Sequence, residues 1–263
     1  MRKGLEYTMR DVNGNLHGRN GRFVRKPLDA DDLLDETSLC RDWAKERMTD
    51  LLWRTAKVEV RGLTFLDTKD ITEGMTPKTD KEIEDFSVVV NLKRAWQYLF
   101  DKCDDWVDWH YLCEYNRILG EGIVPNAGHI RTRGIHVDDY LPPIPREERV
   151  AEDIFEALSE KDPVDKAIRL YAVTARGQWF NNGNKRTAAM AANHSLIHDG
   201  EGVLVLPPDH MSEFTRVLMD WYKSGELEPF SEWMRYHTII RVGDKGTDAW
   251  KDGVDGEAGR LNP

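Results

Sequence analysis

Two helical patterns in this chain are separated by a polar loop, Ala175-Arg176-Gly177-Gln178-Trp179-Phe180-Asn181-Asn182-Gly183-Asn184-Lys185-Arg186-Thr187. The loop enters the following helix through Gly183, where unpaired backbone N–H groups and the helix dipole together favour an anion. Lys185 and Arg186 add formal positive charge at that point. The sequence therefore predicts an anion site. The alternative is that Asn182 or Asn184 caps the helix and that both cations are solvated.

The composition excludes several classes of protein. The chain has 263 residues and a formal net charge of -10, and it has no run of lysine and arginine, which argues against a nucleic-acid surface. Its three cysteines lack metal-ligand spacing, as is typical of reduced thiols. We expect neither a signal peptide nor a membrane span, because no long apolar run occurs. These observations predict a cytoplasmic protein without a nucleic-acid or membrane partner.

The apolar spacing predicts an all-α chain in four parts. They are an N-terminal arm (1–30) with turns or a small hairpin, a helical region (31–80), a helical core (81–240) and a disordered tail (241–263). The expected helices span about residues 31–54, 66–73, 81–100, 106–119, 146–158, 163–175, 184–198, 208–223 and 229–237.

One segment departs from the helical pattern. Ile135, His136 and Val137 alternate as a strand does, and prolines close the segment at positions 142, 143 and 145. Proline suits an edge strand because it cannot donate to an interior ladder. We therefore expect a short exposed β-hairpin as the one strand-like insertion in the helical chain.

At the polar loop the chain resembles the Fic/Doc family, whose motif reads His-x-Phe-x-Asp/Glu-Gly/Ala-Asn-Gly/Lys-Arg. The matching residues are Phe180, Gly183, Asn184, Lys185 and Arg186. The resemblance covers roughly residues 50 to 225. Within it Thr55 to Glu59 is similar to the family's inhibitory-helix pattern, Asn91 to Ala95 to the helix that opens the core, and Ala127 to Arg131 to its Gly-x-x-Arg turn.

The resemblance implies a fold and a site. The fold is an all-α Fic-like core with a β-hairpin flap, preceded by a helical N-terminal region. Nucleotide phosphates would lie at Asn182, Gly183, Asn184, Lys185 and Arg186. A protein target would dock at the flap residues Ile135, His136 and Val137 by strand pairing. Family members typically transfer adenylate from ATP, with Mg²⁺, to a target hydroxyl, and they need no permanent cofactor.

Two departures fall on residues that this reaction needs. The motif histidine is replaced by Gln178, which can orient a hydroxyl by hydrogen bonding but cannot accept its proton. Loss of a positioned general base costs about 10²- to 10⁴-fold in rate. The acidic position is Asn182, whose single neutral amide oxygen predicts weak magnesium binding unless the nucleotide supplies most of the ligands.

Further departures concern the phosphates and the inhibitory segment. Lys185 stands where adenylate-transferring members usually have glycine, which resembles the Doc branch, whose activity is phosphorylation. The second arginine of the longer motif is replaced by Ala189, which removes the usual partner of the candidate inhibitory residue Glu59. Val60 also departs from the inhibitory pattern. Glu59 is therefore interpreted as a relic of the inhibitory pattern.

Two functions compete. In the first, the chain is a divergent nucleotide-dependent transferase of weak or altered activity, with Gln178 orienting the acceptor. In the second, it is a pseudoenzyme that acts by binding nucleotide or protein. An introduced substitution at position 178 would give the same sequence, although Asn182 favours natural divergence.

Other side chains are weighed against structural roles. The i,i+4 pair His194 and His198 has the spacing of two metal ligands but no evident third ligand, so surface or capping histidines are the stronger interpretation. His129 and His136 lie near the flap and are either surrogate bases or, more simply, exposed loop residues. Trp179, unlike the other tryptophans, is expected beside the nucleotide.

Overall fold

The computed structural model describes residues 7–10, 16–18, 36–60, 62–75, 77 and 80–242. The predicted helix start at Asp31 or Asp32 and residues 243–263 of the predicted tail lie outside the described residues. Arg241 and Val242 are described: Arg241 pairs with the buried Glu201 at 3.0 Å, and Val242 packs against the core. No helix among the described residues is long and apolar enough to cross a membrane.

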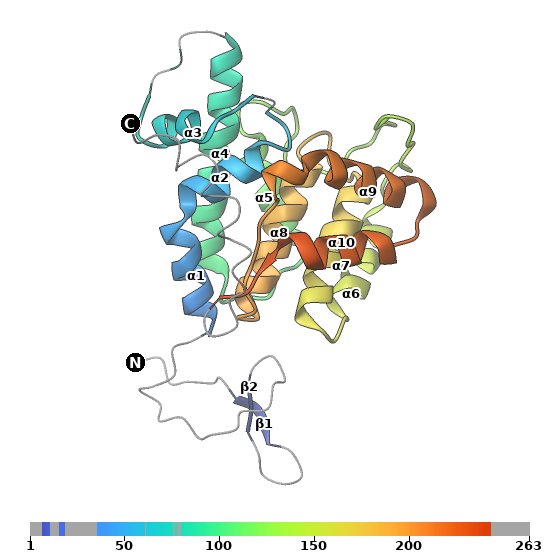
Figure 1. Ribbon diagram of the computed structural model, residues 1–263. Coiled ribbons are helices and arrows are strands. Elements are labelled where there is room, and N and C mark those ends of the chain that lie inside the picture. The colour runs from blue at the N-terminus through green and yellow to red at the C-terminus, as the bar shows by residue number, and fades with distance from the viewer. Residues whose placement is uncertain are drawn as a thin grey trace.

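Ten α-helices and two small sheets make up the described chain (Figure 1). The helices are α1 (Glu36–Glu46), α2 (Met48–Ala56), α3 (Phe65–Thr72), α4 (Asp80–Lys102), α5 (Trp109–Gly120), α6 (Glu147–Leu158), α7 (Pro163–Gly177), α8 (Asn184–His198), α9 (Met211–Ser224) and α10 (Glu228–Thr238). The short 3₁₀ helix η1 (Pro208–His210) precedes α9, and the strands are β1 (Tyr7–Arg10), β2 (Leu16–Gly18), β3 (Val203–Leu204) and β4 (Ile239–Ile240). The predicted all-α class is confirmed.

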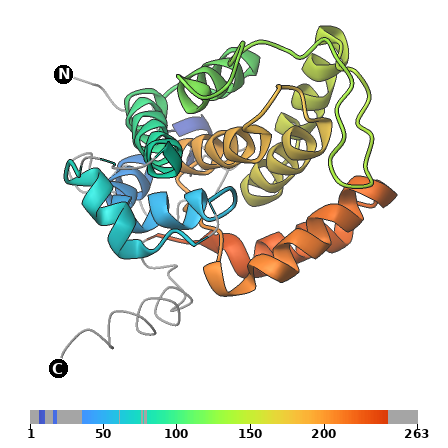
Figure 2. The same cartoon turned by 90° about the horizontal axis from the view of Figure 1, so that it is seen from above.

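Helix α8 is the centre of this arrangement. Every α8 residue except Lys185 is buried, and the helix contributes to all three hydrophobic clusters. One cluster joins it to α1, α2, α4 and α5, a second to α7, α9 and α10, and a third to α5, α6 and α7. Figure 2 shows α8 between the blue and green helices and the orange α9 and α10. Its alanines at 188, 189, 191 and 192 let these neighbours approach closely.

The single helix expected over residues 31–54 is wrong, because the chain breaks at Arg47 between α1 and α2. Arg47 has φ −109° and ψ 19°, and its N–H donates to the carbonyl of Ala44 at 3.2 Å, which is a turn rather than a helical bond. Its guanidinium lies 4.5 Å from the ring of Trp43. The break lets Ala44 of α1 and Leu52 of α2 pack into one core cluster, which overrides local helix propensity.

The strand expectations need two corrections. The predicted N-terminal hairpin is confirmed as the antiparallel pair β1–β2. The flap, however, forms a single bridge between Val137 and Tyr140 across a turn at Asp138, so the strand expected over residues 135–137 does not form. Nor is the flap the one strand-like insertion, because β3 pairs antiparallel with β4. Asn193 of α8 holds β3 through both the N–H and the carbonyl of Leu204, at 2.8 and 3.0 Å.

The two α8 histidines hold the connection between α4 and α5 rather than a metal. His194 bonds the Tyr115 hydroxyl through Nδ1 at 2.8 Å and the Asp105 carbonyl through Nε2 at 3.0 Å. His198 bonds the Cys103 carbonyl at 3.0 Å. Among the described residues no group of three metal-ligating side chains occurs. The geometry therefore supports a structural role for both histidines.

Burial of His194 predicts a loss of stability in acid. Its pKa is lowered from 6.5 to about 4, chiefly by desolvation, so the unfolded state takes up a proton first as the pH falls. The contribution of neutral His194 to the free energy of unfolding is complete above pH 6.5 and decreases as the pH falls toward 4. Urea titrations should show a loss of roughly 2 kcal/mol between pH 7 and 4.5 that His194→Gln lacks. Equal pH slopes in the two proteins would contradict this account.

Candidate functional site

The polar loop turns the chain from α7 into α8 through two left-handed residues. Gln178 ends α7 with φ 46°, and Gly183 precedes α8 with φ 75°. The side chain of Asn184 closes the loop: its Oδ1 accepts from the N–H of Phe180 at 2.9 Å, and its Nδ2 donates to the carbonyl of Phe180 at 2.9 Å. Asn184 therefore supports the loop from inside, at 4% exposure.

The amide of Gln178 is engaged within the protein. Its Nε2 donates to the carbonyl of Ala175 at 2.7 Å and to the hydroxyl of Tyr222 at 3.3 Å, and its Oε1 accepts from Nδ2 of Asn184 at 3.1 Å. The side chain is buried. Burial raises the pKa of Tyr222, so that phenol does not replace the missing histidine as a base. An acceptor-orienting role for Gln178 stays a prediction, and it requires one of these bonds to open.

Asn182 does not supply a metal ligand in this arrangement. Its Oδ1 accepts from the N–H of Gly183 at 2.6 Å, and its backbone carbonyl accepts from Nδ2 of Asn116 at 2.9 Å. The amide oxygen is thus turned toward the loop itself. Since the described residues also lack a cluster of three ligand side chains, this site does not fit a magnesium ion held by the protein.

Arg186 is a buried cation beside the loop glycine. It is 3% exposed, and its Nη2 lies 3.6 Å from the place where a Cβ on Gly183 would stand. Within the described chain it forms no ion pair: Nε has no hydrogen-bond partner, and Nη1 makes one long bond of 3.5 Å to the carbonyl of Leu119. Burial lowers its pKa accordingly. The carboxylate of Glu59 partly counteracts this shift, although it forms no close ion pair with the guanidinium in the described chain.

Lys185 and Glu59 meet at the same end of α8. The Lys185 ammonium is partly exposed and lies 3.9 Å from the carboxylate of Glu59, which follows α2. Position 189, where the family motif places its second arginine, is an alanine buried at 3% exposure. Glu59 is therefore brought to the loop by the fold, with Lys185 as its partner. An inhibitory role for Glu59 stays a prediction.

Comparison with known proteins shows that the loop lies within a family match. A model of the Fic/DOC family matches residues 106–196, which include α5, the loop and most of α8. Residues 106–196 match a Fic domain. It is 25% identical over 234 residues to protein adenylyltransferase fic-1 of Caenorhabditis elegans, covering 84% of this chain and 46% of that protein. Protein adenylyltransferase Fic of Drosophila melanogaster is 22% identical, with the same coverage of both chains. This chain thus spans less than half the length of these curated relatives.

Solved structures agree on the fold. Fic-1 (residues 134–508) of Caenorhabditis elegans has a TM-score of 0.65 at 22% identity and covers 76% of this chain and 62% of that one. A Fic domain containing signaling protein of Bacteroides thetaiotaomicron has a TM-score of 0.62 at 16% identity, covering 80% and 86%. At such identities the likeness shows a shared fold. The Fic-like helical architecture predicted from the sequence is confirmed.

Asn116 is a site residue of the Fic domain that the sequence analysis missed. Its Nδ2 donates to the carbonyl of Asn182 and to the hydroxyl of Thr187, at 2.9 and 3.1 Å, and its Oδ1 accepts from the N–H of Gly128 at 2.9 Å. It is 1% exposed on α5. The available signal was a lone asparagine among the apolar residues of a helix, which marks a buried polar group that needs partners.

Arg131 joins the flap to the loop. Its guanidinium is 1% exposed and donates to the carbonyl of Gln178 at 2.5 Å, and on the flap side to the carbonyls of Arg133, Pro142 and Pro143, at 2.6, 3.4 and 2.5 Å. The family turn over Ala127 to Arg131 includes this arginine, but the resemblance implies no role for it. One buried cation therefore fixes both ends of the flap and position 178.

The flap tip rests on α9. Tyr140 packs on Tyr222 with ring centroids 5.3 Å apart, and Asp139 pairs with Lys223 at 3.2 Å. In the segment expected to dock a target, Ile135 and Val137 are half-buried and His136 is exposed. His129 is likewise exposed. Docking at the flap stays a prediction.

The sequence predicts Trp179 beside the nucleotide, but the structure buries this side chain in the core. It is 3% exposed and meets the ring of Trp109 edge-on at 6.0 Å. Its indole occupies the space that a side chain at Gly177 would need, with Nε1 only 2.1 Å from an ideal Cβ there. Phe180 stacks on the same Trp109 at 5.6 Å. The two aromatic residues of the motif thus anchor the loop.

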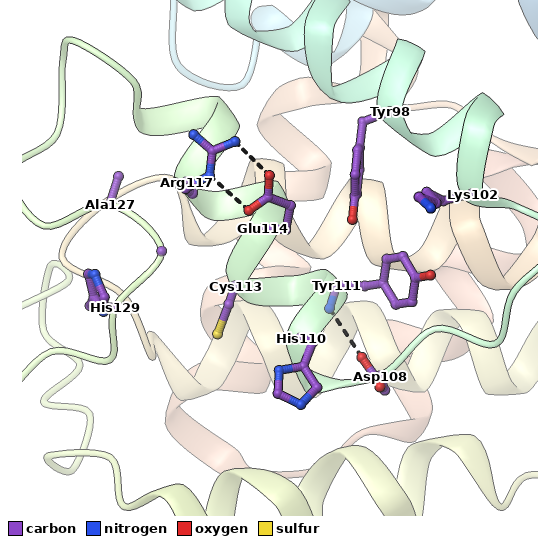
Figure 3. Close-up of a pocket in the computed structure, with 11 residues that line it drawn as sticks. Tyr98, Lys102, Asp108, His110, Tyr111, Cys113, Glu114, Arg117, Ala127 and His129 are labelled. Atoms are coloured by element: carbon purple, nitrogen blue, oxygen red, sulfur yellow. Dashed lines mark hydrogen bonds and ion pairs between the residues drawn. The ribbon is translucent and has the colours of Figure 1, made fainter.

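A separate cavity of about 530 Å³ lies between α4, α5 and the turn at residues 127–129 (Figure 3). Its described lining residues include no member of the loop. Glu114 and Arg117 form an ion pair in its wall at 2.5 Å. Burial is the main cause that raises the pKa of Cys113 to about 12. That thiol is not a nucleophile near neutral pH.

Removing the Arg131 guanidinium should free the flap. Arg131→Met leaves several buried carbonyls without donors, and we expect the free energy of unfolding to fall by about 2–4 kcal/mol. Hydrogen exchange should accelerate over residues 133–143. The matched control is Arg133→Met, which changes an exposed arginine two residues away and should leave both properties unchanged. Equal effects of the two substitutions would contradict the role given to Arg131.

Proposed function

We propose that this chain is a divergent Fic-type nucleotide-dependent transferase, which moves AMP or phosphate from ATP to a hydroxyl of a protein target at a low rate. The observation that carries the proposal is the buried Arg186, which forms no close ion pair in the described chain, feels only the longer-range attraction of Glu59, and lies beside Gly183 at the start of α8. A buried charge without a partner is costly to stability. A phosphate group would compensate it.

Three further features support phosphate binding at this point. No side chain caps α8, so its first N–H groups are available to a ligand. Gly183 allows the turn into α8, since its φ of 75° is one that residues with a side chain rarely adopt. Lys185 supplies a partly exposed ammonium on the first turn. Asn182 and Asn184 shape the loop around these groups.

The reaction explains the expected low rate. In AMP transfer the target hydroxyl oxygen attacks the α-phosphorus of ATP, and the bond to pyrophosphate breaks. In phosphate transfer it attacks the γ-phosphorus, and the bond to ADP breaks. Gln178 cannot take the hydroxyl proton, which therefore passes to solvent. That loss costs about 10²- to 10⁴-fold in rate relative to a positioned base.

The target is proposed to be a protein segment at the flap. Two of the relatives are named protein adenylyltransferases, which supports a protein acceptor. The flap backbone between Ile135 and Val137 has room for strand pairing, because only Val137 makes a bridge within the hairpin.

A second candidate function is a pseudoenzyme that binds nucleotide or protein without transferring a group. The three hydrogen bonds of the Gln178 amide favour it, because they place this side chain in a structural role. Phosphate binding at Arg186 is common to both candidates.

ATP binding should depend on Arg186 while stability does not. We expect calorimetric titration of the full chain with ATP and magnesium to show saturable binding, weakened at least about tenfold by Arg186→Met. Because the buried charge forms no close ion pair in the described chain, the same change should leave the melting temperature equal or higher. The control Arg117→Met alters an exposed arginine at the separate cavity and should bind normally. If ATP does not bind at concentrations up to millimolar, nucleotide binding is contradicted for both candidate functions.

Restoring the missing groups should separate the two candidates. The double variant Gln178→His, Asn182→Asp regains a general base and a carboxylate, and histidine tolerates the left-handed backbone at position 178. With labelled ATP and candidate target proteins, we expect slow labelling by the natural chain and labelling about 10²- to 10⁴-fold faster by the variant. Labelling by the variant alone would favour the pseudoenzyme.

A further inference from the structure

We propose that the anion site at the start of α8 binds nucleotide phosphates without a divalent cation, and that Lys185 supplies the positive charge that a magnesium ion would otherwise supply. The inference rests on the proposed phosphate site. It concerns how that site compensates the charge of its ligand, and it starts from the mismatch between the loop and a bound metal.

The first observation is the orientation of Asn182. Its side-chain oxygen accepts the N–H of Gly183 at 2.6 Å, and its carbonyl is held by Asn116 at 2.9 Å. A neutral oxygen already used by the loop is a poor ligand for a hard cation, which prefers carboxylates and water. The described residues offer no cluster of three ligand side chains in its place.

The second observation is the supply of positive charge. Arg186 is buried and its Nε has no partner, so a phosphate is the group that would complete its hydrogen bonding. The uncapped start of α8 adds backbone donors and the positive end of the helix dipole. These groups are fixed by the fold, and they act on phosphate oxygens without a bridging ion.

The third observation is Lys185 itself. It is the one residue of α8 that is not buried, and its ammonium lies at the same helix end as Arg186. Its contact with Glu59 is loose, at 3.9 Å between partly exposed groups, which is a weak ion pair. An ammonium with three donors on a flexible stem can turn from that carboxylate to a phosphate.

Arg186 and Lys185 also explain why Asn182 suits the site. A carboxylate at position 182 would lie on the same short loop as the phosphates, and it would repel them unless a cation lay between. The neutral amide removes that repulsion. Asparagine at 182 and lysine at 185 thus act together in the proposed site: the first offers no carboxylate to a metal, and the second supplies the positive charge.

The test is titration of the full chain with ATP in EDTA and in excess magnesium, beside three variants. We expect dissociation constants within about threefold of each other in the two buffers for the natural chain. Lys185→Met should weaken binding in EDTA by about tenfold or more, while Lys185→Arg keeps it near the natural value. Asn182→Asp should weaken binding in EDTA and recover it in magnesium.

Three outcomes would overturn the inference, and they differ in what else they affect. Binding by the natural chain in magnesium alone would overturn the metal-free site but leave the proposed phosphate site intact. Equal binding by Lys185→Met and the natural chain in EDTA would remove Lys185 from the site. Failure of ATP to bind in either buffer would overturn the proposed function as well.

Discussion

The structure depends on the burial of α8 on all sides. A helix packed against three hydrophobic clusters cannot shift along its axis without disturbing each of them, so its first turn is fixed in space. That first turn is also the only part of the helix with a side chain outside the core, at Lys185. The fold therefore presents a rigid, positively charged helix end at the place where the polar loop enters. Such a helix end needs no rearrangement to hold an anion.

Two buried arginines near this end illustrate the difference between a structural and a ligand-binding cation. Arg131 is satisfied by the carbonyls of the flap and of Gln178, and its charge serves to join two segments of chain. Arg186 is equally buried, but only a long bond to the carbonyl of Leu119 satisfies it within the described chain. Since buried polar groups are nearly always paired, an incomplete set of partners around a fixed guanidinium is informative. This incomplete set of partners is the ground on which a bound anion is proposed.

The unusual residues of the motif are absorbed into the loop's own hydrogen bonds. Gln178 bonds Ala175, Tyr222 and Asn184, and Asn182 bonds the N–H of Gly183. Amides suit this role because each carries both donors and an acceptor, whereas a carboxylate accepts only. The loop is thus held by its own amides at the positions where the family motif has a histidine and a carboxylate. The proposal of a domain that binds nucleotide and transfers slowly rests on this arrangement.

The sequence by itself determined the helical class, the bounds of α8 and the residues around its start, because glycine and a polar loop between two periodic segments are local signals. It also indicated the N-terminal hairpin through local turn residues. Only the tertiary structure decided the break at Arg47, the inward turn of Trp179, the absence of a strand at residues 135–137 and the roles of Asn116 and Arg131. Each of these depends on partners far away in the chain. A hydrogen bond between α5 and α8, or between the flap and residue 178, leaves no periodic trace in the sequence, since it is set by how the helices pack.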